Sequence, residues 1–305
     1  MTASPARYHI THDTHYRYAA PVSLSQQQLH LQPRAMPYQR CLQQQLTIQP
    51  EPSDRTHFMD SFGNPCTLLS FNFQHDALLV CAQMDIEVSA RELEPQLSHS
   101  PPWETVVNLC RYHSQQALSP ELLAALPFRF ESPFVHLKHH FADYAHDCFT
   151  LGRPLLQAAQ ALMRKIFNEF TFDPNATHIG TPLLEVLANK RGVCQDFAHL
   201  MLACLRSLGL PARYVSGYLL TNPPAGQARL IGADASHAWV AVYCPVLGWV
   251  DFDPTNNVIP NTEHITLSWG RDFSDISPLR GVILGGGQHE LDVRVTVMPA
   301  AEQQR

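Results

Sequence analysis

The sequence lacks several features that mark common classes of protein. Its longest apolar runs fall well short of the roughly 20 residues that a membrane-spanning helix needs, so we expect no membrane insertion. Lysine and arginine number only 21 against 27 acidic residues, and the net charge of −6 argues against binding to nucleic acid. Residues 1–7 lack the basic-then-apolar order of a secretion signal, which favours a cytoplasmic location. What remains is an ordinary globular chain of 305 residues, 45% apolar and 16% charged, long enough for two domains.

The cysteines and histidines also lack the spacing of a metal or redox site. None of the eight cysteines forms a Cys-x-x-Cys pair, so we expect no zinc centre and no other cofactor. His136 and His140 have the i, i+4 spacing that suits zinc on one helix face, with His146 and Cys148 close behind. No metal motif fixes their geometry, however, and 17 histidines in one chain produce such a pair by chance. In a reducing compartment, most of the cysteines are expected to be buried thiols.

One cysteine stands at the start of a helix. From Phe197 onward, apolar residues recur at offsets of 0, 3, 4, 7, 8 and 11, which predicts one face of an α-helix that stops at Gly209. Gly192 lets the backbone turn before this helix, and Cys194 falls in its first turn. Free N–H groups and the helix dipole favour a thiolate there. The same N–H groups could hold the oxyanion of a tetrahedral intermediate.

Two downstream segments supply an imidazole and a carboxylate. Residues 237–242 alternate in the manner of a strand, and residues 249–253 form a second short strand. Neighbouring antiparallel strands can place His237 beside a carboxylate. Asp251 and Asp253 have the same parity, so alternation does not choose between them. A thiol, an imidazole and a carboxylate are the parts of a cysteine nucleophile, its base and the group that orients the base.

Three motifs carry a family resemblance: Gly-Val-Cys-Gln-Asp-Phe-Ala (192–198), His-Ala-Trp-Val (237–240) and Gly-Trp-Val-Asp-Phe-Asp-Pro-Thr (248–255). As a set they resemble the core of the transglutaminase-like superfamily and, more narrowly, its bacterial branch of candidate cysteine proteases. The resemblance implies that Cys194 is the nucleophile, His237 the base and Asp253 the third member of the triad. It also implies an α+β fold with a papain-like core, in which the nucleophile helix packs on an antiparallel sheet.

The resemblance extends over nearly the whole chain. Residues 8–18, 29–34 and 60–64 resemble the β-rich N-terminal region that accompanies this bacterial core, and residues 269–281 resemble the segment that follows it. We expect four parts: a β-rich N-terminal domain at 1–95, a connector of helices and loops at 96–150, the catalytic core at 151–262, and a C-terminal segment at 263–305. The alternating residues 289–297 predict a half-buried strand that returns to the N-terminal domain.

Local patterns predict further elements. An apolar stripe that includes Phe167 indicates a helix over 154–170. Thr181 and Pro182 are expected to open a shorter helix as its N-cap and first residue. Strands are expected at 42–48, 67–73, 77–88 and 213–219.

Several side chains are candidates for supporting roles. Trp239 and Trp249 are expected to pack around the thiol and imidazole and exclude water, although plain core aromatics would give the same pattern. Asp196 is expected to stabilise the helix N-terminus through the dipole, and Gln195 follows the nucleophile. Tyr218 is a candidate for lining the substrate cleft. The histidines at 9, 12 and 15 are expected at the surface.

The reaction expected from these residues is acyl transfer through a thioester, with a peptide or amide as substrate. Water as acceptor makes the protein a protease or amidase, and an amine makes it a transamidase of the protein-glutamine gamma-glutamyltransferase kind. Animal transglutaminases carry a tryptophan upstream of the nucleophile, but no tryptophan lies between Trp103 and Cys194, which favours hydrolysis. A non-catalytic binding module on the same fold is a further alternative.

Overall fold

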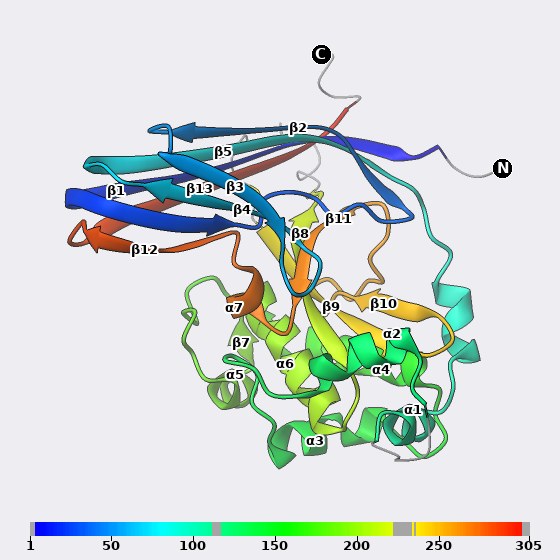
Figure 1. Ribbon diagram of the computed structural model, residues 1–305. Helices are drawn as coiled ribbons and strands as arrows, with labels where there is room; N and C mark the ends of the chain where they lie inside the picture. The colour runs from blue at the N-terminus through cyan, green and yellow to red at the C-terminus, as the bar shows by residue number, and fades with distance from the viewer. Residues whose placement is uncertain (1–3, 112–116, 222–233, 235, 301–305) are drawn as a thin grey trace, which may run out of the picture.

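The computed structural model describes residues 4–111, 117–221, 234 and 236–300. Figure 1 shows two layers: a large β-sheet above, and a smaller sheet surrounded by helices below. The upper layer contains the first strands of the chain and also its last two. The fold is therefore α+β, with a β-rich N-terminal region that the C-terminal end of the chain completes.

The upper sheet has seven strands in the described part of the chain. They are β1 (Ala6–Leu29), β2 (Gln39–Gln49), β3 (Asp54–Met59), β4 (Pro65–Phe71), β5 (His75–Val88), β12 (Leu279–Gly285) and β13 (His289–Pro299). The order β2-β5-β1-β4-β3 forms its main path, and β12 and β13 both pair with β1.

Strand β1 organises this sheet because it is long enough to have two sets of partners. Its first half pairs antiparallel with β5 and β13, and its second half pairs with β4 and β12. Alternate residues of the first half are buried, including Tyr8, Ile10 and His12. This period of two is the pattern of a strand with one face on a hydrophobic core.

The lower sheet has the order β10-β9-β8-β11. Its strands are β8 (Ala212–Leu219), β9 (Ser236–Cys244), β10 (Gly248–Phe252) and β11 (His264–Gly270), all antiparallel to their neighbours. Helix α6 (Cys194–Ser207) packs against β8 and β9. The residues of α6 from Phe197 to Arg206 are buried, because other helices cover the sides that do not face the sheet.

The other helices are α1 (Trp103–Leu109), α2 (Pro120–Ala125), α3 (His139–Ala145), α4 (Leu155–Glu169), α5 (Leu183–Asn189) and α7 (Phe273–Ile276), with 3₁₀ helices η1 (Glu94–His99), η2 (Leu126–Arg129) and η3 (His146–Cys148). Three of these helices, α3, α4 and α5, pack against α6. Short strands β6 (Thr171–Phe172) and β7 (Arg191–Gly192) pair in parallel just before α6. None of the described helices is both long enough and apolar enough to cross a membrane.

The two layers share hydrophobic packing. One cluster of buried side chains fills the space between α4, α6 and β9. A second cluster lies on the upper sheet, and Tyr218, Ile265 and Leu267 of the lower sheet belong to it. The layers are therefore joined by apolar contacts as well as by the chain, which fixes the upper sheet relative to the lower one.

Three local expectations were wrong in detail. Phe167 of α4 is 44% exposed, because it lies beyond the edge of the stripe that packs on the core. Pro182 is itself the N-cap of α5, and the Thr181 hydroxyl instead accepts a hydrogen bond from the His178 N–H (3.0 Å). Residues 289–294 of β13 are exposed on both faces, because the covering side chains begin only at Val295.

Candidate active site

Cys194 is the first residue of α6, and its position depends on the turn before the helix. The Asp196 carboxylate accepts hydrogen bonds from the Val193 N–H (2.8 Å) and from the Thr177 hydroxyl (2.6 Å). A Cβ at position 192 would lie only 2.6 Å from the Asp196 Oδ2 atom, so the turn requires Gly192. Asp196 thus closes the helix N-terminus, as its place in the first turn indicated, and leaves Cys194 half-buried at the surface of the core.

His237 lies between the thiol and a carboxylate. It is the second residue of β9, where its side chain is buried and hydrogen-bonds to Cys194. Its Nε2 atom donates to the Asp253 Oδ2 atom at 2.8 Å. This leaves the Nδ1 atom of the imidazole for the sulfur. The structure therefore brings Cys194, His237 and Asp253 together in the order nucleophile, base, carboxylate.

Asp253 follows β10 and is completely buried. Its Oδ1 atom accepts from the backbone N–H groups of Thr255 (2.9 Å) and Asn256 (3.2 Å). Its Oδ2 atom accepts from His237, from the Asn256 side chain (2.8 Å) and from the His264 Nε2 atom (3.0 Å). Burial raises the pKa of Asp253, but the hydrogen bonds from His237 and His264 outweigh it and hold that pKa well below its usual range. The carboxylate is therefore ionised and fixed in orientation.

The same contacts determine the charge of His237. Burial lowers the pKa of His237, but the hydrogen bonds to Asp253 and to Cys194 outweigh burial and raise it to about 10. At neutral pH the imidazole is therefore protonated beside the sulfur. A positive charge in that place favours the thiolate.

His264 is a residue of this site that the sequence did not reveal. It opens β11, and its ring packs edge-on against Trp239 with 5.2 Å between the ring centroids. Its hydrogen bond to Asp253 depends on the path of the chain through the turns between β10 and β11. No regular spacing links these two residues, so nothing in the sequence distinguishes His264 from the other histidines.

Trp239 lies against the imidazole as expected, with 6.0 Å between the ring centroids, and is completely buried. Gly217 of β8 is opposite His237 in register, and a Cβ there would lie 2.6 Å from the Trp239 ring. Because it is buried against the imidazole, Trp239 closes the site on the side of the sheet.

Gln195 is half-exposed in the first turn of α6.

Trp249 and Tyr218 do not belong to this site, contrary to expectation. Trp249 pairs with Tyr243 at the far end of β9 from His237, because the hairpin between β9 and β10 places it there. Tyr218 is completely buried and faces the upper sheet, where its hydroxyl hydrogen-bonds the Nδ1 atom of His12 at 2.8 Å. His12 is therefore a buried residue and not the surface residue that was expected. It lies 206 positions from Tyr218, so local pattern gave no sign of their contact.

Asp251, the other carboxylate with the right parity, is used elsewhere. Its Oδ2 atom pairs with the Arg91 guanidinium at 3.2 Å. The two aspartates of this motif thus face separate partners along the same side of the sheet, and only Asp253 reaches His237.

Two groups of side chains among the described residues bring three potential metal ligands within 4.8 Å of one another. One is His237, Asp253 and His264, where both imidazoles lie at hydrogen-bond distance from one carboxylate oxygen. The other is His30, Asp60 and Cys66. His136, His140, His146 and Cys148 form no such group within the described part of the chain.

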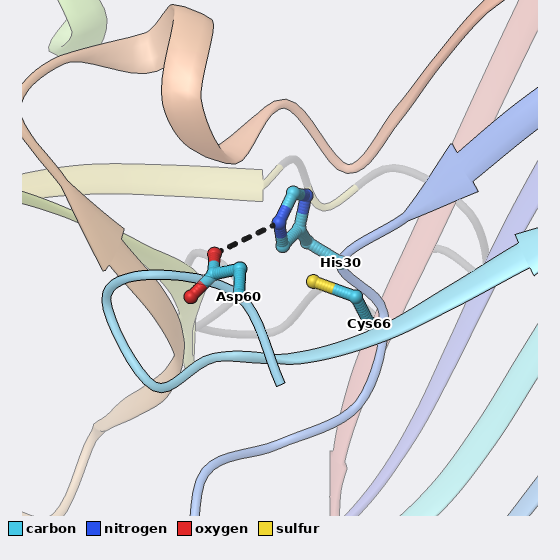
Figure 2. Close-up of side chains that lie close together, drawn as sticks. All are labelled: His30, Asp60 and Cys66. Carbon is cyan, nitrogen blue, oxygen red and sulfur yellow. Dashed lines mark ion pairs between the residues drawn. The ribbon is translucent and has the colours of Figure 1, made fainter. Parts of the chain in front are cut away.

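The second group is His30, Asp60 and Cys66, shown in Figure 2. The His30 Nε2 atom lies 3.4 Å from an Asp60 oxygen, and the Cys66 sulfur points toward both. The other imidazole nitrogen donates to the Ser277 carbonyl at 3.1 Å, and Asp60 accepts from the Asn64 side chain at 2.7 Å. Hydrogen bonds to neighbouring residues therefore explain the positions of the side chains in both groups. That the protein uses no metal cofactor stays a prediction.

Comparisons with known proteins place the chain in a family. Residues 8–87 match the bacterial transglutaminase-like N-terminal region, and residues 142–254 match the transglutaminase-like superfamily. An uncharacterized protein of Mycobacterium bovis is 37% identical over 302 residues, which cover 96% of this chain and 93% of that protein. The chain belongs to the transglutaminase-like superfamily.

Two further proteins show how far the likeness extends. A candidate cysteine protease from Cytophaga hutchinsonii has the same transglutaminase-like fold, with a TM-score of 0.73 and 18% identity over 98% of this chain and 92% of that one. A protein-glutamine gamma-glutamyltransferase of Pseudomonas aeruginosa is 33% identical over 109 residues, which cover 33% of this chain and 16% of that protein.

Proposed function

We propose that this transglutaminase-like protein is a cysteine protease or amidase that hydrolyses a peptide or amide bond through a thioester on Cys194. The observation that carries the proposal is the place of His237, whose imidazole hydrogen-bonds both the Cys194 thiol and the Asp253 carboxylate. A base held between a nucleophile and an orienting carboxylate is the arrangement that nucleophilic catalysis requires.

In the first half of the reaction, the Cys194 thiolate attacks the carbonyl carbon of the substrate. The carbonyl oxygen becomes an oxyanion, which the backbone N–H of Cys194 at the helix N-terminus stabilises. The tetrahedral intermediate then collapses, and the bond to nitrogen breaks. His237 gives its proton to the departing amine, and the acyl group stays on the sulfur as a thioester.

In the second half, water resolves the thioester. His237, now neutral, takes a proton from the water as it attacks the acyl carbon. The bond from carbon to sulfur breaks, and the carboxylic acid leaves. Asp253 keeps the imidazole in one orientation through both halves, since its own carboxylate is fixed by five hydrogen bonds.

Two features of the chain bear on whether water or an amine accepts the acyl group. No tryptophan lies between Trp103 and Cys194, where animal transglutaminases carry the residue that stabilises their oxyanion, and this supports hydrolysis. The Pseudomonas relative is named as a gamma-glutamyltransferase, and for that reason the test includes an amine.

The experiment incubates the protein with a pool of peptides and simple amides, quenches in acid and maps adducts by mass spectrometry. We expect an acyl adduct on the peptide that contains Cys194, and we expect it to decay to the free acid even when lysine methyl ester is present. A dominant lysine product would make the protein a transamidase instead.

The control is Cys194→Ala, which should give neither an adduct nor a product. If this variant keeps the turnover of the unmodified protein, the proposal is wrong. The protein is a binding module instead if the unmodified protein forms no adduct and the Cys194→Ala variant restores the phenotype of cells that lack the protein.

A further inference from the structure

A large cavity among the described residues lies away from Cys194, where the two layers meet. It has a volume of about 1040 Å³ and is lined mainly by apolar and aromatic side chains. The turn between β1 and β2, the turn between β3 and β4, helix α2 and the strands β8, β10 and β11 all contribute to its wall. A cavity of this size and character is typical of a site for a small ligand.

Arg213 of β8 is the unusual residue of this wall. Its side chain is only 6% exposed, and its guanidinium lies between two indole rings, 3.5 Å from the Trp269 centroid and 4.3 Å from that of Trp249. Among the described residues it donates no hydrogen bond, and its Nε atom is buried without a partner. Because both indole rings lie within stacking distance of the guanidinium carbon, the edge of the guanidinium with its N–H groups is the part left for a ligand.

Two carboxylates of the cavity wall, Asp251 and Asp275, already have arginine partners of their own. Asp251 attracts Arg213 but forms its ion pair with Arg91, at 3.2 Å. Asp275 holds both sides of the Arg271 guanidinium at 2.9 Å.

Two other charged groups face the cavity or its wall. Arg34 lies over Trp269 at 3.5 Å from the ring centroid and donates to the Asn64 side chain. Glu121 is exposed in the first turn of α2 and so remains in contact with water. The buried wall therefore carries an excess of positive charge at Arg213, and burial of an unpaired charge is costly unless a partner arrives.

We propose that this cavity binds a ligand that carries a carboxylate on an apolar or aromatic body. The carboxylate pairs with the open edge of the Arg213 guanidinium, between Trp249 and Trp269. A guanidinium offers two parallel N–H groups at its edge, which match the two oxygens of a carboxylate. The apolar body of the ligand occupies the rest of the cavity.

The site is separate from the thiol, although the side chains of Arg213 and His237 lie on the same face of the lower sheet. Arg213 is opposite Ala241 in register, whereas Gly217 is opposite His237, so the two sites are four residues apart along β8. At about 3.3 Å per residue this is roughly 13 Å, and the completely buried Trp239 lies between them. Binding in the cavity therefore does not depend on the activity that we propose for Cys194.

The experiment measures binding by calorimetry on the Cys194→Ala protein, in which no thioester can form. The probes are N-benzoylglycine, which carries a carboxylate on an aromatic body, and the neutral N-benzoylglycinamide. We expect saturable binding of the acid, and binding of the amide weaker by about tenfold or more, since charge-assisted hydrogen bonds are lost. Equal binding of the two, or no saturable binding of the acid, would overturn the proposal.

Variants then locate the site. Arg213→Met should weaken binding of the acid by about tenfold or more, because it keeps an unbranched apolar stem and removes the charge and the N–H groups. Arg40→Met is the matched control: it removes one positive charge from an exposed residue of β2 that pairs with Glu87 of β5, and it should leave binding unchanged. Unchanged affinity in Arg213→Met, or an equal loss in Arg40→Met, contradicts the proposal.

Hydrogen exchange keeps the test decisive if Arg213→Met does not fold. In the Cys194→Ala protein, N-benzoylglycine should slow exchange in the peptides that contain Arg213, Trp249 and Trp269. Protection confined to other segments would show that the acid binds elsewhere.

Discussion

The cluster of Cys194, His237 and Asp253 and the cluster of Cys66, His30 and Asp60 each combine a thiol, an imidazole and a carboxylate, and they differ in almost every other respect. Cys194 opens a helix, is half-exposed and shares the imidazole of His237 with Asp253. Cys66 lies within β4 and is only 1% exposed, beside His30 and Asp60. A thiol, an imidazole and a carboxylate are therefore not enough for a reactive nucleophile. The sulfur must also be accessible to a substrate and lie at a helix N-terminus that favours its ionised form.

The two imidazoles also carry opposite electrostatics. At His237 a 2.8 Å hydrogen bond to Asp253 and a second to Cys194 outweigh burial, and the pKa rises to about 10. At His30 burial is the larger effect and lowers the pKa, since Asp60 is 3.4 Å away and Arg280 adds a repulsive positive charge. One cluster therefore holds a proton at neutral pH and the other does not.

The largest difference is expected in turnover. Cys194→Ala should lower kcat/KM for the substrate found by adduct mapping by about a thousandfold or more, because the nucleophile is lost. Cys66→Ala should leave kcat/KM within about twofold, since its sulfur is enclosed in the upper sheet. Hydrolysis assays on both variants, each with a melting curve, test this. An equal loss in a folded Cys66→Ala protein would mean that the second cluster takes part in the reaction.

Alkylation should separate the two sulfurs by access. In the native protein, iodoacetamide at about pH 7 should modify Cys194 before Cys66 by more than about tenfold, and Cys66 should react only once the upper sheet opens. Peptide mapping of the modified protein at successive times gives both rates. Similar rates for the two sulfurs in folded protein would remove the contrast between the clusters.

His264 sharpens the comparison, because within the described part of the chain the group at Cys66 contains one imidazole, that of His30. As a positioning residue it acts through Asp253, so His264→Leu should lower kcat by about tenfold and change KM little. His264→Gln keeps a donor and should recover most of that loss. If Leu and Gln lose equal activity in step with their melting temperatures, His264 is only structural.

The smallest expected effect is on stability, and its sign differs between the clusters. The pKa of His237 is raised above its value in the unfolded chain, so its contribution is complete below about pH 6.5 and is lost as the pH rises through about 10. The pKa of His30 is lowered by folding. Its contribution to the free energy of unfolding is therefore present above about pH 6.5 and is lost as the pH falls through the pKa of His30 in the folded protein.

Urea unfolding across this range, for the unmodified protein and for His237→Asn and His30→Asn, measures the difference. The slope for a single proton approaches about 1.4 kcal/mol per pH unit. His237→Asn should flatten the alkaline side and His30→Asn the acid side. The reverse assignment would contradict the account of both imidazoles.

Local pattern predicted the parts of the site that depend on local geometry. The apolar offsets after Phe197 define α6 and so the place of Cys194, and alternation puts His237 at the start of a strand. Parity could not separate Asp251 from Asp253, and only the family resemblance chose Asp253. In the structure Asp251 faces Arg91, a contact between residues 160 positions apart that no periodicity encodes.

The rest depends on contacts that are distant in the sequence. Strand β1 pairs with four other strands, and its partners lie up to 291 positions away, as between Tyr8 and Pro299. Alternation within the strand carries no information on such partners, so the length of β1 could not be predicted from it. Strand β3 is exposed at every residue and β12 at most, which removes the apolar period that marks a strand. His264 reaches Asp253, and Tyr218 reaches His12, only because turns and layers bring them together.

The most direct test of the central claim is the alkylation rate of Cys194 as a function of pH, in the unmodified protein and in His237→Asn. If a protonated imidazole holds the sulfur as a thiolate, the rate in the unmodified protein stays high from about pH 8 down to about pH 6, and His237→Asn loses most of it over that range. Equal rates in the two proteins at every pH would show that His237 does not activate Cys194.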